Sequence, residues 1–147
     1  MPKVKQLGLS DTEEIKRLFK DIFTKAPWND DWSDESQLHN YILDLTGNRN
    51  SFAFGLYEGD GLIGLSLGSI IHWYEGTEYY IFEFCIKTEL QGKGYGTFFL
   101  GKVEEFVKEK GIDHIFLQTE RTFPAYEFYL KNGFTDMKEH VSLFKKF

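Results

Sequence analysis

The chain has 147 residues, of which 41% are hydrophobic and 27% are charged, and its formal net charge is −6 at pH 7. These values are typical of one soluble globular domain, so we treat residues 1–147 as a single domain. The excess of acidic side chains works against broad binding to nucleic acid, whose phosphates require lysine and arginine. No apolar run approaches the ~20 residues of a membrane-spanning helix, and the N-terminus lacks the apolar segment of a signal peptide. We therefore expect a cytoplasmic protein with neither a nucleic-acid nor a membrane partner.

The chain has one cysteine, Cys85, between Phe84 and Ile86 in an apolar stretch. One thiol forms no intramolecular disulfide and supplies no metal-ligand spacing, so we expect no metal. No histidine stands beside it to form a nucleophilic pair. We expect Cys85 to be a small buried side chain and not a nucleophile.

The first third of the sequence predicts a strand followed by two helices. A short strand over 4–9 precedes Ser10, which we expect to be the N-cap of a helix, with Glu13 completing a capping box. Apolar residues at helical spacing continue this helix until Pro27 ends it. A second amphipathic helix is predicted from Asp34 to Leu45.

From residue 51 the apolar period changes to two, which indicates strands. Three strands with turns at 58–61 and 75–77 lead into a helix over 95–110. A strand over 114–120, a short helix over 124–130 and a last strand over 137–147 complete the chain. The order β-α-α-β-β-β-α-β-α-β-β predicts an α/β (mixed α+β) fold, with six or seven mostly antiparallel strands and helices on both faces of the sheet.

The run QGKGYG, residues 91–96, lies between a predicted strand and a predicted helix. A nucleotide P-loop would need a hydroxyl where Val103 stands, and a dinucleotide fingerprint would need different glycine spacing after a parallel strand. Two interpretations remain: a glycine-rich connection, or a cradle of backbone N–H groups at a helix N-terminus that binds a diphosphate.

Two segments resemble one known family. Gln91-x-x-Gly94-x-Gly96 resembles the [RQ]-x-x-G-x-[GA] signature of the GNAT superfamily of acyl-CoA-dependent N-acyltransferases. The stretch AYEFYLKNGF, from Ala125 to Phe134, resembles that family's A-x-x-x-Y-x-x-x-G-F segment. The two occur in the family's order, separated by a helix and a strand. The predicted order of elements also resembles the GNAT fold over essentially the whole chain.

The resemblance implies transfer of an acetyl group from acetyl-CoA to a primary amine, by direct attack in a ternary complex. It also implies that main-chain groups of the strand before the loop hold the thioester arm, and that loop amides hold the pyrophosphate. Thr122 stands where many members have an asparagine, which leaves the finer contacts of the arm open. The residues that this resemblance assigns to coenzyme A are Phe84, Cys85, Ile86, Gln91, Gly92, Lys93, Gly94, Tyr95, Gly96, Thr97, Thr122, Ala125 and Phe128.

Two residues are candidates for proton transfer. Glu83 is an acid within an apolar strand, three residues before Ile86, where many relatives carry Asp or Glu, and it is the expected general base. Glu120 is the reserve candidate. Tyr129 matches the family tyrosine that protonates the departing thiolate.

The acceptor is the least defined part. Trp28, Asp30, Asp31 and Trp32 lie between the first two predicted helices, and indoles with acids favour a cationic amine. Trp73 and Glu120 are further candidates for the acceptor site. We expect a small cationic amine; a peptide or protein amine, or a non-catalytic acyl-CoA-binding domain, stay open as alternatives. Homodimers occur in the family and are an additional expectation.

Overall fold

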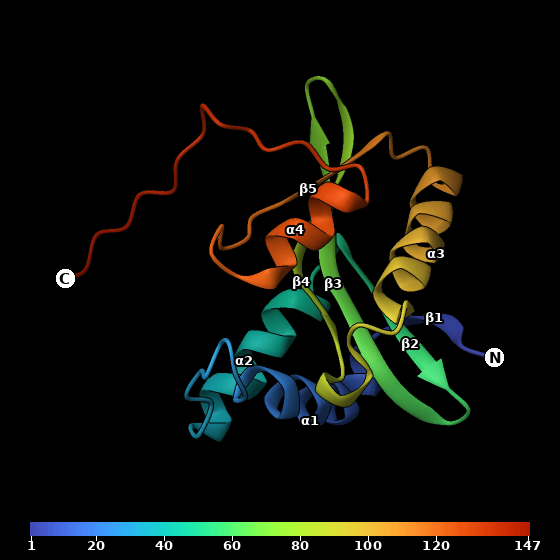
Figure 1. Ribbon diagram of the computed structural model, residues 1–147, viewed down its shortest axis with the longest axis vertical. Helices are drawn as coiled ribbons and strands as arrows, with labels where there is room; N and C mark the ends of the chain where they lie inside the picture. The colour runs from blue at the N-terminus through green and yellow to red at the C-terminus, as the bar shows by residue number, and fades with distance from the viewer.

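The computed structural model describes residues 1–147, and its centre is one five-stranded sheet in the order β1-β2-β3-β4-β5 (Figure 1). The first four strands run antiparallel to their neighbours, whereas β5 pairs with β4 in parallel. The strands are β1 (Lys3–Leu7), β2 (Ser51–Glu58), β3 (Gly61–Trp73), β4 (Gly76–Ile86) and β5 (His114–Leu117). The helices are α1 (Thr12–Phe23), α2 (Glu35–Thr46), α3 (Tyr95–Glu109) and α4 (Pro124–Lys131), with short 3-10 turns η1 (Leu9–Asp11) and η2 (Thr88–Leu90).

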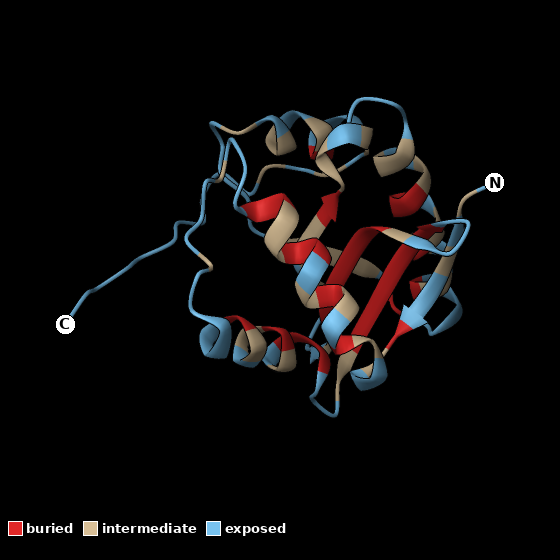
Figure 2. Ribbon diagram, turned by 90° about the horizontal axis from the view of Figure 1, so that it is seen from below, coloured by how far each residue is buried: buried red, intermediate tan, exposed pale blue.

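Helices cover both faces of the sheet, as predicted. One face packs against α1 and α2, through residues such as Phe19, Leu38 and Leu67. The opposite face packs against α3, where Phe54 and Phe99 belong to a second core. Because both faces are covered, β2 and β3 are buried along most of their length, which appears as red ribbon in Figure 2.

The two N-terminal helices begin close to the predicted positions. The prediction that Ser10 caps the first helix is wrong, because α1 begins at Thr12 after the 3-10 turn η1. Asp11 is the N-cap residue of α1, but its carboxylate caps the preceding turn η1, where it accepts a hydrogen bond from the Gly8 N–H at 2.9 Å. Asp34 is the N-cap of α2, and its carboxylate accepts the Gln37 N–H at 3.0 Å.

The prediction of a last strand over 137–147 is also wrong, and the sheet has five strands where six or seven were predicted. The segment follows Asp136, whose carboxylate is bound by Arg121 and Tyr126, and it contacts the body again where the Gln118 amide donates a hydrogen bond to the Ser142 hydroxyl at 3.1 Å. Its apolar side chains, including Leu143 and Phe144, are exposed. The end of the chain extends away from the rest of the protein (Figure 1). A strand requires a hydrogen-bonding neighbour, and this segment pairs with none.

None of the helices has the length and apolar character required to cross a membrane. No three His, Cys, Asp or Glu side chains are grouped so that they could hold a metal ion.

Candidate functional site

The site is organised by an irregularity in β4. Glu83 pairs with Leu67 of β3, whereas Ile81 pairs with the next residue, Gly68. Phe82 is therefore an extra residue on β4, as in a β-bulge. Bulges occur next to active sites, where they turn a side chain toward a new face.

The bulge decides which face Glu83 occupies. Ile81 before the bulge and Phe84 after it both belong to the core on the α3 side. Cys85 belongs to the core on the side of α1 and α2, and Glu83 reaches α2 on that same side. In a regular strand Glu83 would share a face with Ile81 and would point toward α3.

Tyr41 of α2 meets the Glu83 carboxylate. Its hydroxyl donates a hydrogen bond to Glu83 Oε2 at 2.5 Å. Burial raises the pKa of Glu83 to about 7, the hydrogen bond from Tyr41 lowers it, and the charge of Asp30 raises it. Burial and the Glu83 charge raise the pKa of Tyr41, so this hydroxyl remains a donor. Glu83 is thus a carboxyl group that gains and loses a proton near neutrality.

Aromatic rings surround this pair. The Trp32 ring stacks on Tyr41 with centroids 5.3 Å apart, and Phe19 contacts both rings edge-on. Trp28 packs on Phe23 at 4.9 Å. Trp28 also reaches Phe123, between β5 and α4, at 6.5 Å. These aromatic contacts therefore join two segments that are distant in the chain.

The remaining acceptor candidates lie in other environments. The Asp31 carboxylate is exposed and accepts the Ser33 N–H at 3.0 Å, which makes it part of a local turn. Glu120 is exposed, and its side chain makes no hydrogen bond within the chain. Trp73 is 54% exposed at the β3–β4 turn. It lies six residues along β3 from the partner of Glu83, a separation of about 20 Å, so the fold does not bring it to Glu83.

The edge of β4 is open next to Glu83. The parallel pairing of β4 with β5 runs from Glu78 to Ile81 and then stops, while β4 continues to Ile86. The main chain of 84–86 therefore has no β5 neighbour. These are the positions that the sequence assigns to the thioester arm.

The glycine loop follows at the end of this open edge. Gly92 and Gly94 have φ values of 75° and 89°, which glycine adopts without steric cost, and Gly94 is the N-cap of α3. None of the six backbone N–H groups from Gly92 to Thr97 donates a hydrogen bond within the chain. Consecutive free N–H groups at a helix N-terminus fit an anion such as a diphosphate.

The side chains of the loop have differing roles. The Gln91 amide donates to the Ile86 carbonyl at 3.0 Å and thereby holds the loop against the end of β4. The Tyr95 hydroxyl donates to Glu58 at 3.1 Å, beside the β2–β3 turn. Lys93 is exposed, forms no ion pair, and is free to meet a phosphate.

The third glycine serves packing. A Cβ on Gly96 would stand 2.9 Å from the Phe128 ring, so only glycine lets α4 pack against the start of α3. Ala125 lies in the first turn of α4, while Thr97 and Thr122 are exposed. No contact within the chain defines a role for either threonine.

Tyr129 of α4 is 8% exposed and packs edge-on against Phe84 and Phe134, at 6.4 and 5.3 Å. Burial, followed by the charges of Cys85 and Glu83, raises its pKa, so the phenol stays protonated. Its hydroxyl makes no hydrogen bond within the chain. It is a free donor close to the open part of β4.

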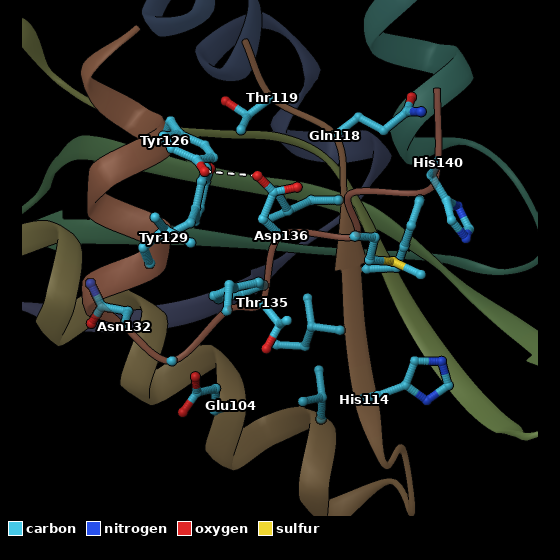
Figure 3. Close-up of a pocket in the computed structure, with 18 of the residues that line it drawn as sticks. Glu104, His114, Gln118, Thr119, Tyr126, Tyr129, Asn132, Thr135, Asp136 and His140 are labelled. Carbon is cyan, nitrogen blue, oxygen red and sulfur yellow. Dashed lines mark hydrogen bonds between the residues drawn. The ribbon is translucent and has the colours of Figure 1, made fainter. Parts of the chain in front are cut away.

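A separate cavity lies away from Glu83 and the glycine loop. It has a volume of about 850 Å³ and lies between α3, β5, α4 and residues 135–142 (Figure 3). Tyr129 borders it, but Glu83 and the glycine loop do not. The cavity lies along the side of β5 that carries no further strand. Because neither Glu83 nor the glycine loop lines it, we place neither the acetyl donor nor the amine acceptor in it.

The sequence profile of the acetyltransferase (GNAT) family matches residues 12–134. The chain belongs to the GNAT acetyltransferase family. The glycine loop and the Ala125–Phe134 segment both lie within the matched residues.

Among curated proteins, the uncharacterized N-acetyltransferase YobR of Bacillus subtilis (strain 168) is 31% identical over 88 residues, which are 59% of this chain and 34% of that protein. This chain thus spans about a third of that relative.

Among solved structures, the aminoglycoside acetyltransferase meta-AAC0020 from an uncultured soil metagenomic sample, in complex with sisomicin, has a TM-score of 0.77 at 21% identity, over 99% of this chain and 96% of the other. AAC(6')-Iy in complex with a CoA-S-monomethyl-acetylneamine bisubstrate analogue has a TM-score of 0.75 at 16% identity, over 99% and 98%. At these identities the two structures show a shared fold.

Sequence reasoning missed Tyr41 and the bulge. The helical periodicity placed Tyr41 on the inner face of α2 together with Leu38 and Ile42. The available signal was a hydroxyl-bearing ring on an otherwise aliphatic face, because a buried phenol requires a polar partner.

Proposed function

We propose that this chain is an N-acetyltransferase that moves an acetyl group from acetyl-CoA to the primary amine of a small cationic molecule. The observation that carries the proposal is the position of Glu83. It is a partly buried carboxyl with a pKa of about 7, and it immediately precedes an open strand edge that leads to a row of unpaired N–H groups. A proton acceptor thereby stands next to a site of the shape that a thioester arm and a pyrophosphate require.

On the donor side, the main chain of Phe84, Cys85 and Ile86 holds the pantetheine arm, and the amides of 92–97 together with Lys93 hold the pyrophosphate. Acetyl-CoA supplies the activated acetyl group as its thioester. The surroundings of Gly92 and Gly94 are open enough for close approach of phosphate oxygens, since a Cβ at either position would meet no atom within 4 Å.

On the acceptor side, Glu83 removes a proton from the bound ammonium group, which frees the nitrogen lone pair for attack. The nitrogen then forms a bond to the acetyl carbon as the carbon–sulfur bond breaks. Tyr129 donates its proton to the departing sulfur, and the nitrogen releases its second surplus proton to give the neutral amide, which balances the proton that restores Tyr129. One proton thus moves from the ammonium group to Glu83, whose pKa of about 7 suits this exchange near neutral pH, and another moves from Tyr129 to the sulfur.

A cationic acceptor is supported by the acid and ring composition around Glu83. Trp28 and Trp32 offer ring surfaces to a cation, and Asp30 adds negative charge. The likeness in fold to aminoglycoside acetyltransferases agrees with such a substrate. A peptide or protein amine, or a non-catalytic acyl-CoA-binding role, are the alternatives.

Two further parts of the proposal concern assembly and location. A homodimer is supported by the free side of β5 and by the exposed apolar residues Val141, Leu143 and Phe144. A cytoplasmic location rests on the sequence alone.

The proposal is tested by measuring free-thiol release from acetyl-CoA with cationic, neutral and anionic amines and with peptides. We expect turnover with cationic small amines, increasing as the pH rises through about 7, because Glu83 must be deprotonated to accept a proton. Replacement Glu83→Gln is expected to lower kcat by roughly 10²- to 10⁴-fold, with unchanged affinity for coenzyme A.

Calorimetric measurement of coenzyme A binding separates the alternatives. Binding without turnover of any amine would favour the non-catalytic role. Turnover restricted to peptides would identify a protein-modifying enzyme. Full activity of Glu83→Gln would remove Glu83 from the mechanism.

A further inference from the structure

The Glu83 carboxylate is partly buried and has few hydrogen-bonding partners. Buried carboxylates are ordinarily paired with a cation or hydrogen-bonded by several donors. Glu83 has a single donor, the neutral Tyr41 hydroxyl, which binds Oε2. Oε1 makes no hydrogen bond within the chain, and no lysine, arginine or histidine pairs with either oxygen. The carboxylate therefore keeps its basicity, which an ion pair would remove.

Tyr41 is itself held in place by packing. Its ring lies between Trp32, stacked at 5.3 Å, and Phe19, edge-on at 5.7 Å. The backbone beneath it belongs to α2, whose Leu38 and Ile42 are fully buried. A phenol in this setting has few orientations, so the direction of its O–H is determined by the core.

We propose that Tyr41 is a positioning residue for acetyl transfer: its hydroxyl occupies Oε2 of Glu83 and thereby leaves Oε1 as the atom that receives the proton of the amine. This inference rests on the proposed function. Trp32 helps to hold Tyr41 in place, because its indole stacks on the Tyr41 ring. Tyr41 touches neither substrate and acts through Glu83.

The groups around the pair determine the sign of the expected effect. Asp30 faces both members of the pair, and its charge raises the pKa of each. Asp44, on the same helix, raises the pKa of Tyr41, and the Glu83 charge raises the pKa values of Cys85 and Tyr129. Tyr41 is the only neighbour that lowers the pKa of Glu83. Removing its hydroxyl leaves burial and Asp30 unopposed, so the carboxyl holds its proton to higher pH.

The test is Tyr41→Phe in the full chain, with kcat/KM measured against pH for one cationic amine. The acidic limb is expected to move upward by about one pH unit, with a loss of about fivefold at pH 7 that approaches about tenfold at lower pH. The two profiles should converge at high pH, where Glu83 is deprotonated in both proteins. Because the ring remains, thermal stability should be close to that of the wild type.

Tyr126→Phe is the matched control. It also removes a tyrosine hydroxyl from a carboxylate, since Tyr126 donates to Asp136 at 2.8 Å, but it does so away from Glu83. Its pH profile should match that of the wild type. An equal shift in both variants would overturn the inference, because the effect would not then be specific to the Glu83 contact.

Carboxyl NMR titration of Glu83 provides a measurement that does not require turnover. An upward shift of its pKa in Tyr41→Phe supports the inference, and an unmoved pKa overturns it. If Glu83→Gln retains the acidic limb, the proposed base is wrong and the inference fails with it. If Glu83→Gln loses the limb while Tyr41→Phe leaves it in place, only the positioning role fails.

Discussion

The two halves of the site on β4 are built from different parts of the chain. The donor half, from Phe84 to Thr97, presents backbone groups: an open strand edge and six unpaired N–H groups. The acceptor half consists of side chains, chiefly Glu83, Tyr41 and Trp32, drawn from three separate segments. The donor half should therefore tolerate changes of side chain but not of backbone conformation, and the acceptor half should behave in the opposite way.

The largest effect is expected from Gly94→Glu. Gly94 has a φ of 89°, where a side chain is strained, and the new carboxylate would repel the pyrophosphate from the unpaired N–H groups. We expect affinity for coenzyme A to fall more than about 100-fold, equivalent to about 3 kcal/mol. Calorimetric titration with coenzyme A measures the loss.

Gly101→Glu is its control. Gly101 lies in α3 with no atom near a new Cβ, and its φ is not in the left-handed region, so the same charge is added without strain. This variant should bind coenzyme A as the wild type does. Equal affinities of the two variants for coenzyme A would show that the backbone N–H groups of the glycine loop do not bind the pyrophosphate.

Tyr129→Phe tests the junction of the two halves. The hydroxyl makes no bond within the chain, and its contacts to Phe84 and Phe134 are made by the ring, so stability should barely change. Loss of the proton donor is expected to lower kcat about 10²-fold with coenzyme A affinity retained. Rapid-quench measurement of acetyl transfer isolates this step. An unchanged rate would show that solvent protonates the leaving thiolate.

The same contrast explains what the sequence could predict. Backbone conformation depends mainly on the local sequence. The spacing of Gly92 and Gly94 predicted their loop, and the apolar periodicity predicted α2 and α3 to within a residue at each end. The last strand failed because alternating apolar residues describe a strand's faces but do not provide a partner. β5 has only four residues, and the segment after Asp136 does not pair with it.

Contacts between residues far apart in the chain could not be predicted from local sequence patterns. The sequence predicted Glu83 as an acid within an apolar strand, and its raised pKa follows from the partial burial of its carboxyl group. The bulge at Phe82, however, arises from the pairing of β4 with β3, and it alone turns Glu83 toward α2. The contact with Tyr41, 42 residues away in the chain, depends on that turn and had no signature in either segment.

Cys85→Ala should have the smallest effect on turnover and sharpens the boundary between the halves. Cys85 lies beside Glu83, yet burial and the Glu83 charge raise the pKa of its thiol, so it stays protonated and is a poor nucleophile. Its assigned part is its main chain, which alanine retains. We expect kcat within about a factor of two of wild type and a loss of about 1 kcal/mol of stability, as for removal of one buried methyl. A large loss of kcat, together with an acetylated thiol detected in the wild type by mass spectrometry, would indicate a covalent intermediate in place of direct attack. Cys85 would then act through its side chain and would belong to the acceptor half of the site.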